Sequence, residues 1–133
     1  YWQMDPDQPT DNLRCQLKVD ADGRFEIATT RAVPYMIPTD GPVWKDLVEP
    51  AGRRAWRPCH FHVIVSAPGH RTLVTEIFDA EDPYLEDDAV FGVREALVGR
   101  YETVNDPQAC QRLGWAGPTC TVMRFDIRLS RAG

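Results

Sequence analysis

Apolar and polar residues alternate along several short stretches of the chain. In residues 13–19, Leu, Cys, Leu and Val alternate with Arg, Gln and Lys, and Phe25 and Ile27 continue the alternation after the Asp-Ala-Asp-Gly sequence at 20–23. A period of two is typical of half-buried strands, and an Asp-Gly pair supplies the positive φ that a tight turn requires. The pattern therefore predicts a β-hairpin over residues 13–27.

A second strand pair is predicted in the middle of the chain. Residues 59–66 and 73–78 are mostly apolar, and a Pro-Gly turn signal lies between them. Alternating apolar residues predict a further strand at 123–129. Short strands separated by frequent turns are typical of an all-β sandwich or barrel. We expect a short helix at 42–48, an acidic surface excursion with short turns at 79–100 and a loop at 105–119.

Length and charge narrow the function classes. The chain has 133 residues, as expected for a single domain, and a formal net charge of −5. It has no basic run and no apolar segment near the roughly 20 residues that cross a bilayer. We therefore expect neither a nucleic-acid partner nor a membrane partner, and a cytoplasmic location.

The four cysteines lie at 15, 59, 110 and 120, without a C-x-x-C pair. This spacing disfavours zinc ribbons and thioredoxin-like sites. Reduced thiols are the ordinary state for such a chain in the cytoplasm, and a bridge between Cys110 and Cys120 stays open.

His60 and His62 are the most informative local pattern. Residues i and i+2 of a strand face the same side, so both imidazoles converge on one point, whereas Cys59 and Phe61 face the other side. Two neutral imidazoles are a common start for a metal site, although two unrelated strand histidines would give the same pattern.

The rest of a metal shell is less clear from the residues. The first Glu after the histidine pair is Glu76, too distant for a cupin pattern, and His70 lies in a turn. A zinc hydrolase would need a further ligand such as Asp40, Glu76 or Asp79, but none of these residues lies in a known zinc-binding motif. Tyrosine offers a phenolate that suits Fe(III), and Tyr35 lies between two prolines that stiffen its backbone.

A set of motifs decides between these readings. The motifs are Val-Pro-Tyr-Met-Ile-Pro-Thr-Asp-Gly-Pro at 33–42, Trp-Arg-Pro-Cys-His-Phe-His at 56–62, Ser-Ala-Pro-Gly-His-Arg at 66–71, Asp-Pro-Tyr-Leu at 82–85 and Val-Phe-Gly-Val at 90–93. Together they resemble the intradiol ring-cleavage dioxygenases, most closely the hydroxyquinol type. The resemblance covers nearly the whole chain and implies a β-sandwich with short helical excursions.

The resemblance also implies a site and a reaction. It assigns a mononuclear non-haem Fe(III) to Tyr1, Tyr35, His60 and His62, and it places Arg57 over the substrate ring. The implied reaction cleaves hydroxyquinol or a related catechol with O2, between the two hydroxylated carbons, to a muconate-type or maleylacetate-type product. Tyr35 would be the tyrosine that leaves iron when substrate binds.

Several positions and one region depart from the family pattern, among them Met36 in place of a usual proline and Cys59 in place of a small alanine. Glu76 stands where relatives carry Gln or His, and Trp44 stands where a small glycine is usual, so both are expected in the substrate pocket. Residues 1–133 are expected to be a partial catalytic domain, without the helical region that usually forms the family's homodimer and without two early strands. A non-enzymatic β-sandwich binding module, or an inactive fragment, is the alternative.

Overall fold

The computed structural model describes residues 5–133. The chain divides into two compact units, Tyr1–Arg31 and Ala32–Gly133. Strands dominate the regular structure of the second unit. Tyr1 lies outside the described residues, so its assignment as an iron ligand stays a prediction.

The described part of the first unit consists of turns and extended chain. A tight turn forms where it was predicted: Asp20 N–H donates to the Arg24 carbonyl at 3.0 Å, and Gly23 has a φ of 77°. The predicted strands on either side do not pair, so the hairpin over 13–27 is wrong. All residues from 13 to 31 are exposed, and an isolated two-stranded hairpin with no surface to cover is marginal in water.

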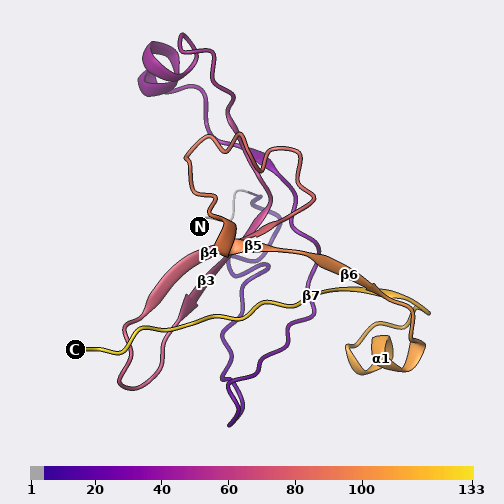
Figure 1. Cartoon of the computed structure of the whole chain (residues 1–133). Coiled ribbons are helices and arrows are strands. Elements are labelled where there is room, and N and C mark those ends of the chain that lie inside the picture. The colour runs from indigo at the N-terminus through magenta and orange to yellow at the C-terminus, as the bar shows by residue number, and fades with distance from the viewer. Residues whose placement is uncertain (1–4) are drawn as a thin grey trace. The chain divides into compact units, whose positions relative to one another are not determined.

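Seven strands in three small sheets make up the second unit, within the described residues (Figure 1). Antiparallel pairing joins β1 to β2 and β6 to β7, whereas β3, β4 and β5 form one sheet with β5 parallel to β4. The strands are β1 Tyr35–Met36, β2 Trp56–Arg57, β3 His60–Val65, β4 Leu73–Asp79, β5 Val98–Gly99, β6 Tyr101–Val104 and β7 Cys120–Met123.

The β3–β4 hairpin positions the site and confirms the predicted central strand pair. Its turn contains Gly69, whose φ of 71° is the left-handed conformation that favours glycine. The register sets His60 opposite Phe78, His62 opposite Glu76 and Val65 opposite Leu73.

The core is built from the C-terminal end of β4 and from the chain on either side of β2. Phe78 is fully buried, and Ile77, Ala55 and Cys59 are nearly so. Burial of a large apolar side chain is worth about 1.5–3 kcal/mol, so Phe78 anchors the C-terminal half of β4. Asp79, the residue after Phe78, is buried as well.

Short helical segments lie outside the sheets. The helix predicted at 42–48 is present, with η1 assigned to Trp44–Val48, and η2 spans Glu95–Leu97 in the predicted excursion. The loop prediction for 105–119 is wrong in part, because α1 spans Pro107–Arg112. Asp106 caps this helix by accepting from the N–H groups of Gln108 and Ala109.

The strand predicted at 123–129 is wrong apart from Met123, because β7 spans Cys120–Met123. Strand β7 ends at Met123, although Phe125, Ile127 and Leu129 remain half-buried while the residues between them are exposed. A disulfide joins Cys110 of α1 to Cys120 of β7, with Cα atoms 5.6 Å apart, so the expectation of reduced thiols holds only for Cys15 and Cys59. Among residues 5–133 no helix has the length and apolarity needed to cross a bilayer.

Candidate metal centre

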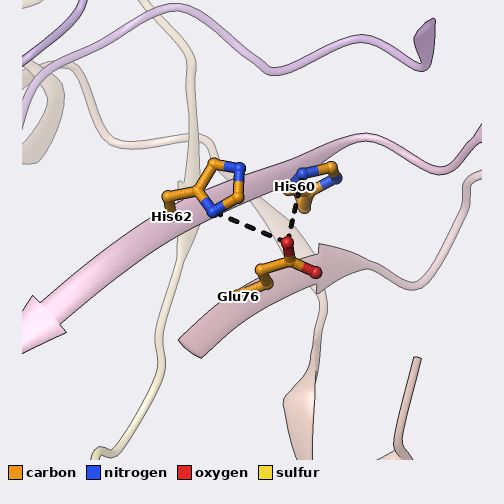
Figure 2. A group of neighbouring side chains, drawn as sticks. All are labelled: His60, His62 and Glu76. Carbon is orange, nitrogen blue, oxygen red and sulfur yellow. Dashed lines mark ion pairs between the residues drawn. The ribbon is translucent and has the colours of Figure 1, made fainter. Parts of the chain in front are cut away.

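Three potential metal ligands meet on one face of the β3–β4 hairpin (Figure 2). His60 and His62 share this face because of the period of two along β3, and Glu76 is brought to it by its register opposite His62. Glu76 Oε1 lies 3.5 Å from His62 Nδ1 and 3.7 Å from His60 Nε2. Figure 2 shows the carboxylate oxygen directed between the two rings.

His60 is fixed in the orientation that a ligand requires. Its Nδ1 lies 2.7 Å from the Pro58 carbonyl, which can only accept, so Nδ1 donates. Its Nε2 lies 3.2 Å from Arg57 Nη1, which can only donate, so Nε2 carries the lone pair. The ring is buried, with 3% of the side chain exposed, and packs against Phe78 with centroids 5.4 Å apart. Backbone contact thus directs the free nitrogen of His60 toward Glu76.

Arg57 links the cluster to the protein interior. Its guanidinium donates from Nη2 to Glu76 Oε2 at 2.8 Å and from Nη1 to Glu76 Oε1 at 3.1 Å, and Nη1 also lies 3.2 Å from His60 Nε2. On its other edge, Nε donates to Asp88 Oδ1 at 3.0 Å. Burial alone would lower the pKa of Arg57, but the hydrogen bonds to Glu76 and Asp88 outweigh it and raise that pKa above its ordinary value. The guanidinium is therefore permanently charged.

Asp88 is the buried anchor of this arginine. Its side chain is 2% exposed and also accepts from the N–H groups of Gly92 at 2.7 Å and Val90 at 3.3 Å. Burial opposes ionisation, yet the hydrogen bonds from Arg57, Gly92 and Val90 lower the pKa of Asp88. The loop that carries Asp88 is tied to β2, because Ala89 N–H donates to the Trp56 carbonyl at 3.0 Å.

The protonation of the other members favours metal binding. The hydrogen bond from Arg57 lowers the pKa of Glu76 despite its partial burial, so Glu76 is a carboxylate. Burial, followed by the neighbouring His60, lowers the pKa of His62 and keeps its imidazole neutral. Neutral imidazole and ionised carboxylate are the forms that bind metal ions.

Tyr35 lies beside the cluster. Strand β1 sets it opposite Arg57, and its ring centroid is 5.7 Å from that of His60. The residue is 44% exposed, which leaves its ring accessible from outside the core. Four of the residues expected in the metal site or over the substrate, Tyr35, Arg57, His60 and His62, are thus adjacent.

Trp44, Cys59 and His70 do not belong to the group of potential metal ligands. Trp44 is half-buried at the start of η1, and its place in the substrate pocket stays a prediction. Cys59 is buried outside the ligand group, as expected, and burial together with Asp82 raises the pKa of its thiol to about 12. His70 is exposed in the turn, with Nδ1 2.9 Å from the Pro68 carbonyl.

Sequence reasoning placed Glu76 in the substrate pocket and considered it as a ligand only for a zinc hydrolase, and it missed Asp88. The position of Glu76 was available from the turn, because a hairpin centred on Gly69 pairs residues equally distant from it, such as His62 and Glu76. Asp88 had no comparable signal, since its contact with Arg57 joins residues 31 apart through an irregular loop.

The donors present fit an iron centre of the kind that the sequence predicts. His60 presents a fixed Nε2, His62 is neutral, and the phenol ring of Tyr35 lies next to them. Imidazole and phenolate together suit ferric iron, since the phenolate is a hard anionic oxygen donor.

The chain has clear relatives among known proteins. A family model described as "Dioxygenase" matches residues 1–131. The chain is 44% identical over 124 residues to hydroxyquinol 1,2-dioxygenase of Rhizobium sp. (strain MTP-10005), covering 93% of this chain and 42% of that protein. It is 36% identical over 133 residues to catechol 1,2-dioxygenase of Acinetobacter baylyi, covering 98% of this chain and 42% of the relative.

Solved structures with a similar fold are also ring-cleaving dioxygenases. Hydroxyquinol 1,2-dioxygenase from Pseudomonas putida DLL-E4 superposes with a TM-score of 0.83 at 44% identity, covering 96% of this chain and 44% of that chain. The all-β fold of the sandwich type is thereby confirmed. The chain spans less than half the length of these relatives. Sequence and fold agree, and the chain belongs to the intradiol dioxygenase family.

Proposed function

We propose that this chain carries the iron(III) site of an intradiol dioxygenase that cleaves hydroxyquinol, or a related catechol, with O2. The observation that carries the proposal is the convergence of Tyr35, His60 and His62 beside the guanidinium of Arg57. The similarity to hydroxyquinol 1,2-dioxygenases favours hydroxyquinol as substrate.

The ligands in this proposal are His60, His62, Tyr35 and, outside the described residues, Tyr1. When bound, Fe(III) supplies Lewis acidity that lowers the pKa of the substrate hydroxyls. His60 is held in a fixed orientation because its Nδ1 is bonded to the Pro58 carbonyl. Tyr35 is the half-exposed ligand, so its phenolate oxygen is placed to accept a hydroxyl proton as the diol binds.

Arg57 stabilises the negative charge that the deprotonated ring develops as it reacts with oxygen. A guanidinium cannot lose its proton, and a preorganised charge acts strongly in a buried site. Glu76 and Asp88 hold the guanidinium from two sides, so it needs no reorganisation during the reaction. Both oxygen atoms enter the product as the bond between the hydroxylated carbons breaks, which gives a muconate-type diacid.

Substitution of Arg57 by Lys tests this role. Lysine keeps the positive charge next to Asp88 but cannot reproduce the two-sided fork, so we expect ring cleavage by the iron-loaded protein to fall about 100-fold or more. The measurement is O2 uptake together with ultraviolet detection of the muconate-type product.

Arg124→Lys is the matched control, because Arg124 is exposed and forms a surface ion pair with Glu102. It should retain wild-type turnover within about twofold, as surface substitutions usually do. Equal activity of the Arg57→Lys protein, or no cleavage of hydroxyquinol or catechol by the iron-loaded wild type, would contradict the proposed function.

A further inference from the structure

We propose that Cys110 and Cys120 form a redox-responsive bridge, which closes by exchange with a small-molecule disulfide and opens in excess thiol. The bridge joins helix α1 to strand β7 with Cα atoms 5.6 Å apart, whereas Cys15 and Cys59 are free. Exchange of this kind needs a sulfur that a reagent can reach and a protein that accommodates both the thiol and the disulfide state. The surroundings of the two cysteines meet both conditions.

The bridge is the main tether of the chain between β6 and β7. Among residues 105–119 Cys110 alone is buried, and it is the one buried residue of α1. A helix of six residues is marginal in water unless tertiary packing holds it. Opening the bridge therefore releases the covalent hold on α1 and leaves only its Asp106 cap and its backbone hydrogen bonds.

The pairing of β6 with β7 brings the two sulfur atoms together. Cys120 is the first residue of β7 and lies opposite Val104, the last residue of β6. Helix α1 begins soon after Val104, and its first turn returns Cys110 to the end of the strand pair. Cys110 Sγ lies 3.5 Å from the Val104 carbonyl oxygen. Backbone pairing thus sets the two cysteines side by side before a covalent bond joins them.

The Val104 carbonyl also provides a partner for the reduced state. A disulfide sulfur carries no hydrogen, whereas the Cys110 thiol can donate to this carbonyl at the distance observed. A buried thiol otherwise packs like a small apolar group. The reduced side chain therefore fits the same position, as a reversible bridge requires.

Cys120 is the point of entry for exchange, because it is half-buried while Cys110 is fully buried. In the closing direction, the Cys120 thiolate attacks one sulfur of a disulfide such as oxidised glutathione, breaks its S–S bond and releases one glutathione thiolate. The Cys110 thiolate then attacks the Cys120 sulfur and releases the second glutathione thiolate. The two cysteines lose two electrons, the glutathione disulfide gains them, and the two cysteine protons pass to the released thiolates. Excess glutathione reverses these steps.

Equilibration of the full chain with glutathione tests whether the bridge is reversible. Samples held at different ratios of reduced to oxidised glutathione are alkylated in denaturant and examined by peptide mapping and mass spectrometry. Cys110 and Cys120 should be protected from alkylation together in oxidised glutathione and modified together in excess dithiothreitol. Cys15→Ser, which removes the exposed free thiol, should show the same transition.

Trypsin cleavage after Arg112 measures the release of α1. Arg112 is exposed, ends the helix and lies within the loop that the bridge closes. Reduced wild type should be cleaved there at least about tenfold faster than the bridged protein, because a cross-link restricts local opening. Each sample is quenched with acid and then reduced, since a cut inside the bridged loop leaves the two fragments joined.

Two controls accompany the cleavage experiment. Cleavage after Arg24, in the exposed turn of the first unit, should differ by less than about twofold between the two states. Cys120→Ser cannot form the bridge and should be cleaved after Arg112 at the fast rate in both buffers. Cys15→Ser should keep the difference between the buffers that wild type shows.

A bridge that stays closed in excess dithiothreitol, or that does not form in excess oxidised glutathione, would overturn the proposal. Equal cleavage after Arg112 in the two states of the wild type would overturn it too. The wild type in two buffers decides the matter even if Cys120→Ser does not fold by circular dichroism. None of these measurements uses iron, so their outcome and that of the proposed function are independent.

Discussion

At the scale of single residues, Arg57 organises the site. Its side chain is only 7% exposed and bonds to Glu76 on one side and Asp88 on the other. A buried charge is tolerated when it is paired and hydrogen-bonded, and removing one partner leaves the other uncompensated. The residues around Arg57 should therefore be far less tolerant of change than the exposed charges elsewhere in the chain.

Gly92 is required by this arrangement. A Cβ at this position would lie 2.9 Å from Arg57 Nη2, 3.0 Å from Asp88 Oδ2 and 3.2 Å from Glu76 Oε2. These atoms cannot move without losing hydrogen bonds, so we expect Gly92→Ala to lower the free energy of unfolding by about 1–3 kcal/mol. Urea denaturation measures the change. Gly41→Ala is the control, since a Cβ there meets nothing within 4 Å, and equal stability of the two variants would contradict this reading.

Asp88 should make stability depend on pH. Its pKa in the folded protein lies below the ordinary value of 3.8, so its stabilising contribution is complete above pH 3.8 and is lost as the pH falls through the lower folded pKa. Asp88→Asn should cost about 3 kcal/mol at pH 7, because it breaks a buried ion pair.

The Asn variant does not titrate at this position. The difference in unfolding free energy between wild type and Asp88→Asn should therefore be constant above about pH 5 and shrink below pH 3.8. Urea denaturation at pH 7 and at low pH checks this. A difference that grows as the pH falls would show that Asp88 is not the ionised partner of Arg57.

The positions of single side chains were predictable where the alternation along one strand determines them. The shared face of His60 and His62 follows from the period of two along one strand. Contacts made through irregular loops have no such period, and Asp88 reaches Arg57 only because the chain around Ala89 bonds back to Trp56. Long-range ion pairs of this kind cannot be found from spacing.

At the scale of elements, two predicted hairpins had opposite outcomes. The β3–β4 hairpin formed because β4 buries Ile77 and Phe78 and pairs with β5 on its other edge. The stretch at 13–27 has equally clear alternation and a well-formed turn, but its apolar side chains remain exposed. Alternation predicts which face a strand would bury, and tertiary packing decides whether the strand forms.

The helix α1 was missed because its six residues lie among Pro, Gly and Asn. Its signal was the Asp-Pro pair at 106–107, an N-cap residue followed by proline in the first turn. Asp106→Ala should lower the free energy of unfolding by about 1 kcal/mol, because two backbone N–H groups lose their acceptor. Thermal unfolding measures the loss. Asp126→Ala, at an exposed position after β7, is the control, and an equal effect there would contradict the capping role.

At the scale of the whole molecule, the chain spans less than half the length of its relatives, and the proposed site residues all lie within it. The fold class was predictable because many short alternating segments with frequent turns leave few alternatives to an all-β architecture. The motifs around Tyr35, Arg57 and His60 are the basis of the proposed iron chemistry. The opposed carboxylates Glu76 and Asp88, which hold the guanidinium, became visible only in three dimensions.

In the proposed function, tyrosine and histidine side chains of this chain hold ferric iron. The visible absorption spectrum of the iron(III)-loaded protein tests it most directly, recorded before and after anaerobic addition of hydroxyquinol. We predict a tyrosinate-to-iron band that shifts when the diol binds and that weakens in Tyr35→Phe. A folded, iron-loaded protein without such a band, or a band unchanged by both the diol and the Tyr35 substitution, would show that tyrosine does not bind the iron.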